Sequence, residues 1–183
     1  MRIVAGKFKG TQLNTFDYDN IRPTADRVRE NIFNKIAFDV FESDVLDLFG
    51  GTGGVSLEFV SRGANVTTVD NNDNSIKLIK KNFEKCRVKP NLMCCDYKKA
   101  LKILQEKKGK FDFIFLDPPF DTDYGEKAIN LIREYGLLKE DGLIIYEHVT
   151  GKEFVLPEKL EFVDNKKYGT ITVSYIREKD ESC

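Results

Sequence analysis

Tryptophan is absent from this sequence of 183 residues, which has only one histidine and four cysteines. The cysteines are Cys86, Cys94, Cys95 and Cys183, and their spacing contains neither a CxxC pair nor a zinc-binding pattern. A disulfide framework and a zinc site are therefore excluded as organising features, and we expect no bound metal. We interpret the cysteines as reduced thiols in the core of a cytosolic protein.

Long apolar runs are also missing. The first ten residues, MRIVAGKFKG, lack the apolar stretch of a signal peptide, and no later run is long enough to cross a bilayer. We therefore expect a soluble, cytoplasmic protein without a membrane partner. An excess of either charge is absent too, since 29 basic residues balance 30 acidic ones. Net charge thus does not indicate a freestanding nucleic-acid binder.

Short apolar runs that alternate with helix-period segments are present from about residue 41 onward. The runs cover residues 44–49, 65–70, 91–96, 111–117 and 143–148. Such alternation is typical of β-α units on a mostly parallel sheet. Residues 159–178 read instead as two alternating strands around a turn, which predicts an antiparallel C-terminal hairpin at one edge. The pattern predicts an α/β fold with one doubly wound, seven-stranded sheet.

The first forty residues follow a different pattern. Two short stretches flank residues 7–10 like a small β-hairpin, and residues 22–38 have helical periodicity. The inner stripe of that helix would consist of Val28, Ile32, Phe33 and Ile36. The length suits a single domain, 1–183. Within it we predict a substrate-side extension, 1–40, and a core, 41–183.

A glycine-rich turn follows the first apolar run of the core. The string DLFGGTGG, residues 47–54, places Gly51 and Gly53 between a strand and a helix, where missing Cβ atoms permit close backbone approach to a ligand. Asp70 lies 19 residues after Gly51 (70 − 51), the place for a carboxylate that accepts from a ribose diol. Asn71 follows it and joins the candidate cofactor residues. An ordinary tight turn is the alternative reading of the glycines.

These features suit either NAD or S-adenosylmethionine. The third glycine of G-x-G-x-x-G is replaced by Ser56, and Asp47 precedes the loop in the D-x-x-x-G-x-G form typical of methyltransferases, so S-adenosylmethionine is favoured. Asp96, at the end of the third run, could accept from an adenine amino group while Tyr97 packs the ring. Asp96 could equally be the N-cap of the next helix, and the two roles are compatible.

The fourth run ends in Asp117, Pro118, Pro119 and Phe120, which resembles the [DN]-P-P-[FYW] motif of methyltransferases that act on amino groups. A carboxylate and a backbone carbonyl can accept both hydrogens of such an amine and aim its lone pair at the methyl. Phe120 would stack on an extruded base, and the prolines would hold acid and ring in fixed relation. The alternative is a turn that merely ends a strand.

The strings RIVAGKFKGTQL, RPTADRVRENIFN, VLDLFGGTGGVSLEFVSRGA, FDFIFLDPPF and GLLKEDGLIIYEH together resemble the bacterial 16S rRNA (guanine-N2)-methyltransferase D family over nearly the whole chain. The resemblance implies a class I methyltransferase fold, S-adenosylmethionine as donor, and transfer to N2 of one guanine in small-subunit rRNA. The RNA would be part of an assembled or assembling subunit. The chain departs from the family's usual pattern with Thr52 in the glycine loop, Asp70 for a frequent Glu, and Phe120 for the commoner Tyr.

Substrate contacts are expected from the N-terminal extension. Arg2, Lys7 and Lys9 lie in the first sixteen residues with no acid among them, so they could grip phosphates. The resemblance places the RPT string beside the active site and so adds Arg22 and Thr24. We interpret the lysine-rich segments 77–89 and 98–110 as solvated helix faces and favour a structural role for His148.

Two rival enzymes remain open. A DNA adenine-N6 methyltransferase shares the DPPF string but usually carries a separate target-recognition region, for which this chain has no room. An NAD-dependent oxidoreductase would need a substrate domain. A non-catalytic RNA-binding module would leave Asp117 and the glycine loop unexplained. We expect an enzyme that acts as a monomer on RNA.

Overall fold

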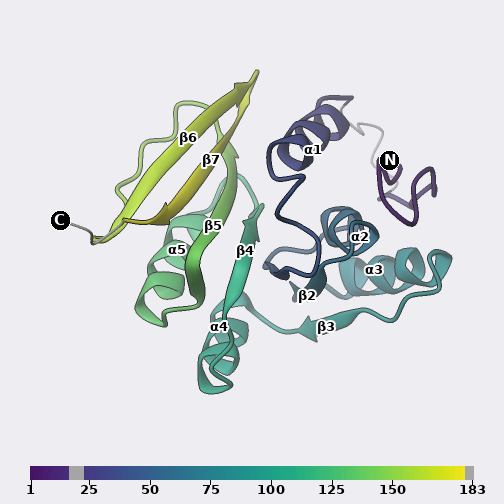
Figure 1. Ribbon diagram of the computed structural model, residues 1–183, viewed down its shortest axis with the longest axis horizontal. Coiled ribbons are helices and arrows are strands. Elements are labelled where there is room, and N and C mark those ends of the chain that lie inside the picture. Colours follow the sequence, from purple (N-terminus) through teal and green to yellow (C-terminus); the bar gives the residue numbers. More distant parts are fainter. Residues whose placement is uncertain (17–22, 180–183) are drawn as a thin grey trace.

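The computed structural model describes residues 1–16 and 23–179, with the side chains of residues 23–25 left out. Figure 1 shows one twisted sheet with helices on both faces. The helices are α1 (Pro23–Lys35), α2 (Gly54–Ser61), α3 (Asp73–Lys85), α4 (Tyr97–Glu106) and α5 (Tyr124–Glu134). The strands are β1 (Asp44–Asp47), β2 (Asn65–Asp70), β3 (Asn91–Cys94), β4 (Phe111–Leu116), β5 (Leu138–Val149), β6 (Leu160–Tyr168) and β7 (Ile171–Glu178).

The sheet has seven strands in the order β3-β2-β1-β4-β5-β7-β6. The first five in that order are parallel, and β7 pairs antiparallel with both β5 and β6. The predicted doubly wound sheet and its antiparallel C-terminal hairpin are thereby confirmed. The strand order reverses between β1 and β4, which is where open α/β sheets bind ligands, outside the carboxyl ends of their strands.

Strand boundaries differ from the prediction at several ends. β5 begins at Leu138 rather than residue 143, because a shift of register between Phe111 and Phe113 of β4 admits the extra charged residues. β4 stops at Leu116, one residue before Asp117, and the prolines that follow cannot donate to the ladder. The carboxylate of Asp117 is therefore presented just beyond the sheet.

Each face of the sheet is covered by its own apolar cluster. Helices α1 and α2 pack on one face, where the predicted stripe of α1 is buried with Phe59 and Phe113; the stripe is Val28, Ile32, Phe33 and Ile36. Helices α4 and α5 pack on the other face through Leu101, Ile129 and their neighbours. Helix α3 lies beside α2 and shares a third cluster with the N-terminal segment.

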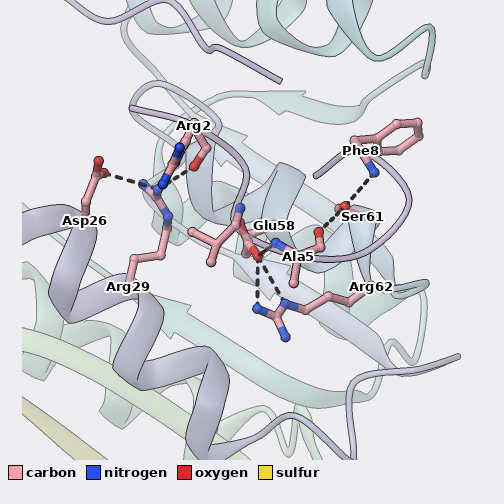
Figure 2. Close-up of polar contacts among 9 residues, drawn as sticks. Arg2, Ala5, Phe8, Asp26, Arg29, Glu58, Ser61 and Arg62 are labelled. Atoms are coloured by element: carbon pink, nitrogen blue, oxygen red, sulfur yellow. Dashed lines mark hydrogen bonds and ion pairs between the residues drawn. The ribbon is translucent and has the colours of Figure 1, made fainter. Parts of the chain in front are cut away.

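The N-terminal segment, which we define as residues 1–16, is only partly the hairpin that we predicted. One antiparallel bridge joins Arg2 to Gln12, and no longer ladder forms within these residues. The reason is that the backbone N–H groups of Val4 and Ala5 donate instead to the Glu58 carboxylate of α2, at 2.8 and 3.0 Å (Figure 2). A side chain thus takes the place of a second strand.

The prediction that the cysteines lie in the core is wrong for Cys94. Cys86 is buried and Cys95 is partly buried, but Cys94 is exposed because it lies on β3, the edge strand of the sheet. All three are free thiols; Cys183 lies outside the described residues. Within the described ranges, no helix combines the length and apolar character needed to cross a membrane.

Candidate active site

A cavity of about 720 Å³ opens where β1, β2, β3 and β4 end. Nine of the residues predicted to bind cofactor or act in catalysis line it: Gly51, Asp70, Asn71, Asp96, Tyr97, Asp117, Pro118, Pro119 and Phe120. They come from four loops that are far apart in sequence. Parallel strands bring these loops together because their carboxyl ends meet at one edge of the sheet.

The glycine-rich turn is built by backbone contacts that exclude larger residues. The N–H of Gly53 donates to the carbonyl of Gly50 at 2.7 Å, and Gly51 and Gly53 have φ angles of +55° and +77°. A Cβ on Gly50 would lie 2.6 Å from the Thr68 methyl group. The turn therefore presents bare backbone to the cavity, immediately before the N-terminus of α2.

Asp70 is held at the edge of this turn. Its two carboxylate oxygens accept from the N–H groups of Gly51, at 2.9 Å, and Asn72, at 2.8 Å. Each oxygen keeps a further lone pair for a ligand hydroxyl. Asn72, which our sequence analysis missed, lines the cavity and caps α3 by accepting from the N–H groups of Asn74 and Ser75.

At the opposite side of the cavity, Asp96 and Tyr97 combine the two roles that we considered. Asp96 caps α4 by accepting from the Lys98 N–H at 2.9 Å, and it remains exposed to the cavity. The buried Tyr97 ring packs between Phe49 and Tyr124, with ring centroids 5.5 and 5.4 Å away. These three aromatic rings form an apolar wall suited to a flat ligand.

A second cavity of about 240 Å³ adjoins the first and shares Gly51, Phe49 and Asp117 with it. Asp47 lines this smaller cavity although its side chain is buried. One oxygen of Asp47 accepts from the Ser56 hydroxyl at 2.5 Å, and Oδ1 has no partner within the described residues. Burial raises the pKa of Asp47 to about 6, against the opposing bond from Ser56.

Two further carboxyl groups line the same small cavity. Asp117 is exposed and lines both cavities. Desolvation by the surrounding protein, followed by the charges of Glu147 and Asp47, raises the pKa of Asp117 well above its usual range. Desolvation also raises the pKa of Glu147, at the end of β5, to about 7. Three carboxyl groups of high proton affinity therefore face one space, an arrangement that favours a cationic ligand.

The loop that carries Phe120 is held in place by a network of polar contacts. The ammonium group of Lys152 donates to the Thr122 carbonyl and to the Glu126 carboxylate, both at 2.8 Å. Glu126 also accepts from the Tyr146 hydroxyl at 2.7 Å. Phe120 itself is 41% exposed and free to meet a planar partner. No local sequence signal identifies Lys152, since 30 residues separate it from Thr122.

His148 has the structural role that we favoured. Its ring is buried and lies within hydrogen-bonding distance of the Ser174 hydroxyl, at 2.8 Å, and the Val149 carbonyl, at 3.0 Å. Burial lowers the pKa of His148, so the neutral ring is favoured. Among the residues that the structure describes, no group of three or more His, Cys, Asp or Glu side chains is arranged to hold a metal ion.

Three of the predicted substrate residues, Arg2, Lys7 and Lys9, do not line the two cavities. Arg2, Lys7 and Lys9 are exposed on the N-terminal segment, whose Met1 and Phe16 do form part of the cavity walls. Arg22 lies outside the described residues, and so does the side chain of Thr24. The remaining predicted residue, Gly53, lies in the glycine-rich turn as the N-cap of α2 and lines neither cavity.

Known proteins resemble this chain in sequence and in architecture. A profile of the family described as "Conserved hypothetical protein 95" matches residues 1–177. "Ribosomal RNA small subunit methyltransferase D" of Haemophilus influenzae is 31% identical over 175 residues, which cover 94% of this chain and 91% of that protein. The solved structure named "Putative methyltransferase yhhF from Escherichia coli" is 27% identical, with a TM-score of 0.84 and 99% of each chain covered.

A more distant solved structure is described as "SMU.776, a putative methyltransferase complexed with SAH". It is 21% identical and has a TM-score of 0.67, over 85% of this chain and 50% of that one. At this identity the likeness concerns the fold alone. The fold of the present chain is the class I methyltransferase fold that the sequence predicted.

Proposed function

The chain belongs to the family described as Conserved hypothetical protein 95, and from that premise we propose that it methylates the exocyclic N2 amino group of a guanine in small-subunit rRNA. At the coarser level it is an rRNA methyltransferase that uses S-adenosylmethionine. The finer assignment rests on the family resemblance and on the chemistry of the DPPF string. We infer that the RNA is presented in an assembled or assembling subunit and that the enzyme acts as a monomer.

S-adenosylmethionine supplies a methyl group that is already activated on a sulfonium centre, so the transfer requires no protein nucleophile. The two adjoining cavities fit such a ligand. Asp70 is placed for the ribose hydroxyls, and Asp96 and the Tyr97 ring for the adenine. The bare backbone of the glycine turn, and the unpartnered Oδ1 of Asp47, suit the charged amino-acid end. Asn71 completes the rim beside Asp70.

Asp117 is the residue that we place at the substrate amine. Its carboxylate lies where the two cavities meet, so it faces both the methyl donor and the incoming base. By accepting from the amine, Asp117 favours a pyramidal nitrogen whose lone pair points at the methyl. The same carboxylate can take the proton that the methylated nitrogen must lose.

Phe120 is the stacking platform for the extruded guanine. Its exposed ring follows two prolines and a loop anchored by Lys152, so its position relative to Asp117 is fixed. Stacking of a base on an aromatic ring contributes ~1–3 kcal/mol, enough to offset much of the cost of unstacking it.

The observation that carries the proposal is that Asp117, which follows β4, lines a cavity large enough for the cofactor. The test is to incubate the protein with methyl-labelled S-adenosylmethionine and undermethylated small ribosomal subunits, with matched naked rRNA and DNA. The labelled nucleoside is then identified by mass.

Label in N2-methylguanosine would support the proposal, and comparison of subunits with naked rRNA would test the need for assembly. Label in N6-methyladenine of DNA would favour the rival DNA methyltransferase. Absence of label from every RNA would overturn the proposed substrate.

A further inference from the structure

Two helices carry the lysine-rich stretches of the sequence, but they differ in where they lie. Helix α3 has four lysines and α4 has three. Helix α3 lies beside α2 and the N-terminal segment, whereas α4 packs on the opposite face of the sheet with α5 (Figure 1). The two helices are therefore both rich in lysine but lie in different surroundings.

The N-terminal segment is joined to α3 by polar contacts. The side chain of Asn82 accepts from the Asn14 N–H at 2.7 Å and donates to the Asn14 carbonyl at 3.0 Å. The Lys85 ammonium group donates to the Gln12 carbonyl at 3.0 Å, and Gln12 is the bridge partner of Arg2. Through these contacts the N-terminal segment is held against the C-terminal half of α3.

Three lysines of α3 lie in a row between the N-terminal segment and the active-site end of the helix. Lys77, Lys81 and Lys85 are spaced four residues apart, so they lie along one side of the helix, with Lys85 at the junction. The N-terminus of α3 is capped by Asn72, which lines the large cavity. Lys77 and Lys81 are exposed and form no ion pair with any described residue.

Hydrogen bonds to α2 also hold the N-terminal segment in place. Glu58 is buried, and it accepts from two backbone N–H groups of the segment and from Arg62 at 3.0 Å (Figure 2). The Ser61 hydroxyl accepts from the Phe8 N–H at 2.9 Å. Because Arg62 pairs with it, the Glu58 charge does not oppose the basic residues nearby. The exposed acids of this region include Glu30, Glu84 and Asp73, and Asp73 lies four residues before Lys77 on α3.

We propose that the N-terminal segment and three of the four lysines of α3 form one surface that binds the RNA backbone and directs it to the active-site cavity. The members of this surface are Arg2, Lys7, Lys9, Lys77, Lys81 and Lys85. The lysines of α4 lie outside it. The proposal rests on the proposed function, since it takes RNA as the substrate. Phosphate contacts of this kind position a nucleic acid without reading its sequence.

The experiment compares two double variants that remove equal charge. Lys77→Gln/Lys81→Gln changes the proposed surface, and Lys99→Gln/Lys102→Gln changes exposed lysines of α4. Neither pair makes a described contact that holds the fold. RNA affinity of each variant is measured between low and moderate salt, with S-adenosylmethionine affinity measured by calorimetry as a check on folding. Wild-type methylation, with the nucleoside identified by mass, is measured in parallel.

We expect the α3 variant to bind RNA more weakly and to lose about one to two units of salt-dependence slope, while the α4 variant matches the wild type. An unchanged α3 variant, or an equal loss in both variants, would overturn the proposed surface. If one of those two results is obtained while the wild type methylates guanine in RNA, the proposed function stands and only the proposed surface is wrong. If the wild type neither binds nor methylates RNA, the proposed function fails first.

Discussion

The affinity for S-adenosylmethionine should rise with pH because carboxyl groups line the small cavity. Burial raises the pKa of Asp47 to about 6, and that of Glu147 to about 7. A cationic ligand binds the ionised forms best. If binding requires both carboxylates, ionisation of Glu147 contributes ~10-fold, and that of Asp47 ~2-fold, between pH 6 and pH 8. The expected increase in affinity is therefore ~20-fold, or ~1.8 kcal/mol.

The affinity should rise with pH, rather than fall, because the pKa values of both carboxyl groups are raised. Each group holds a proton more tightly in the free protein than a solvated carboxyl does, so binding of a cation must release protons. At pH 6.5 the two groups together hold about one proton, and about one should be released. Titration calorimetry in buffers of different ionisation enthalpy measures both the affinity and the number of protons.

The Glu147→Gln variant is the matched control, because it keeps the shape of the side chain and removes its titration. Its affinity should change only ~2-fold over the same pH range, through Asp47 alone. An affinity of the wild type that is flat from pH 6 to pH 8, or proton uptake on binding, would refute the reasoning.

Four other substitutions test separate parts of the structure. Asp117→Ala should lower methyl transfer by at least ~10²-fold and leave S-adenosylmethionine affinity within a few-fold; an equal collapse in calorimetry would place Asp117 at the cofactor instead. Lys152→Met should free the loop that carries Phe120 and raise the KM for RNA about tenfold with cofactor affinity unchanged, and an unaltered KM would contradict this. Glu58→Ala should cost ~3–5 kcal/mol of stability, seen as a drop of about 10 °C in Tm, because buried donors lose their acceptor. Because the pKa of Asp47 is raised, this group contributes to the free energy of unfolding at low pH, and the contribution is lost as pH rises from about 4 through about 6. The Asp47→Asn variant should therefore lack ~3 kcal/mol of the wild type's decrease in the free energy of unfolding over that pH range, as measured by denaturant titrations at a series of pH values.

Sequence reasoning located the part of the site that depends on local pattern. Asp70 and Asp117 each come at the end of an apolar run, and parallel strands present such ends at one edge of a sheet. The glycines before α2 are recognisable because only they tolerate the positive φ angles and close contacts of the turn. Periodicity and turn chemistry thus predicted where these residues lie, at the edge of the sheet and in the turn before α2.

The remaining parts depend on contacts between distant segments. No pattern in the sequence singles out Glu147, and its place beside Asp117 follows from the pairing of β4 with β5. Lys152 reaches the catalytic loop across 30 residues. The partial N-terminal hairpin could not be foreseen either, because the competing acceptor, Glu58, lies more than 50 residues away. Such pairings carry no local periodicity.

The crowding of Asp47, Asp117 and Glu147 around one space also has a consequence for turnover. On the proposed mechanism, the positive charge of a bound sulfonium would offset the repulsion among these carboxylates. Loss of that charge on methyl transfer would raise the proton affinity of Asp117 again. Asp117 would then accept a proton more readily at the stage when the methylated nitrogen has one to lose. The same loss of charge would weaken the attraction between these carboxyl groups and the spent cofactor, so proton removal and product release would be coupled.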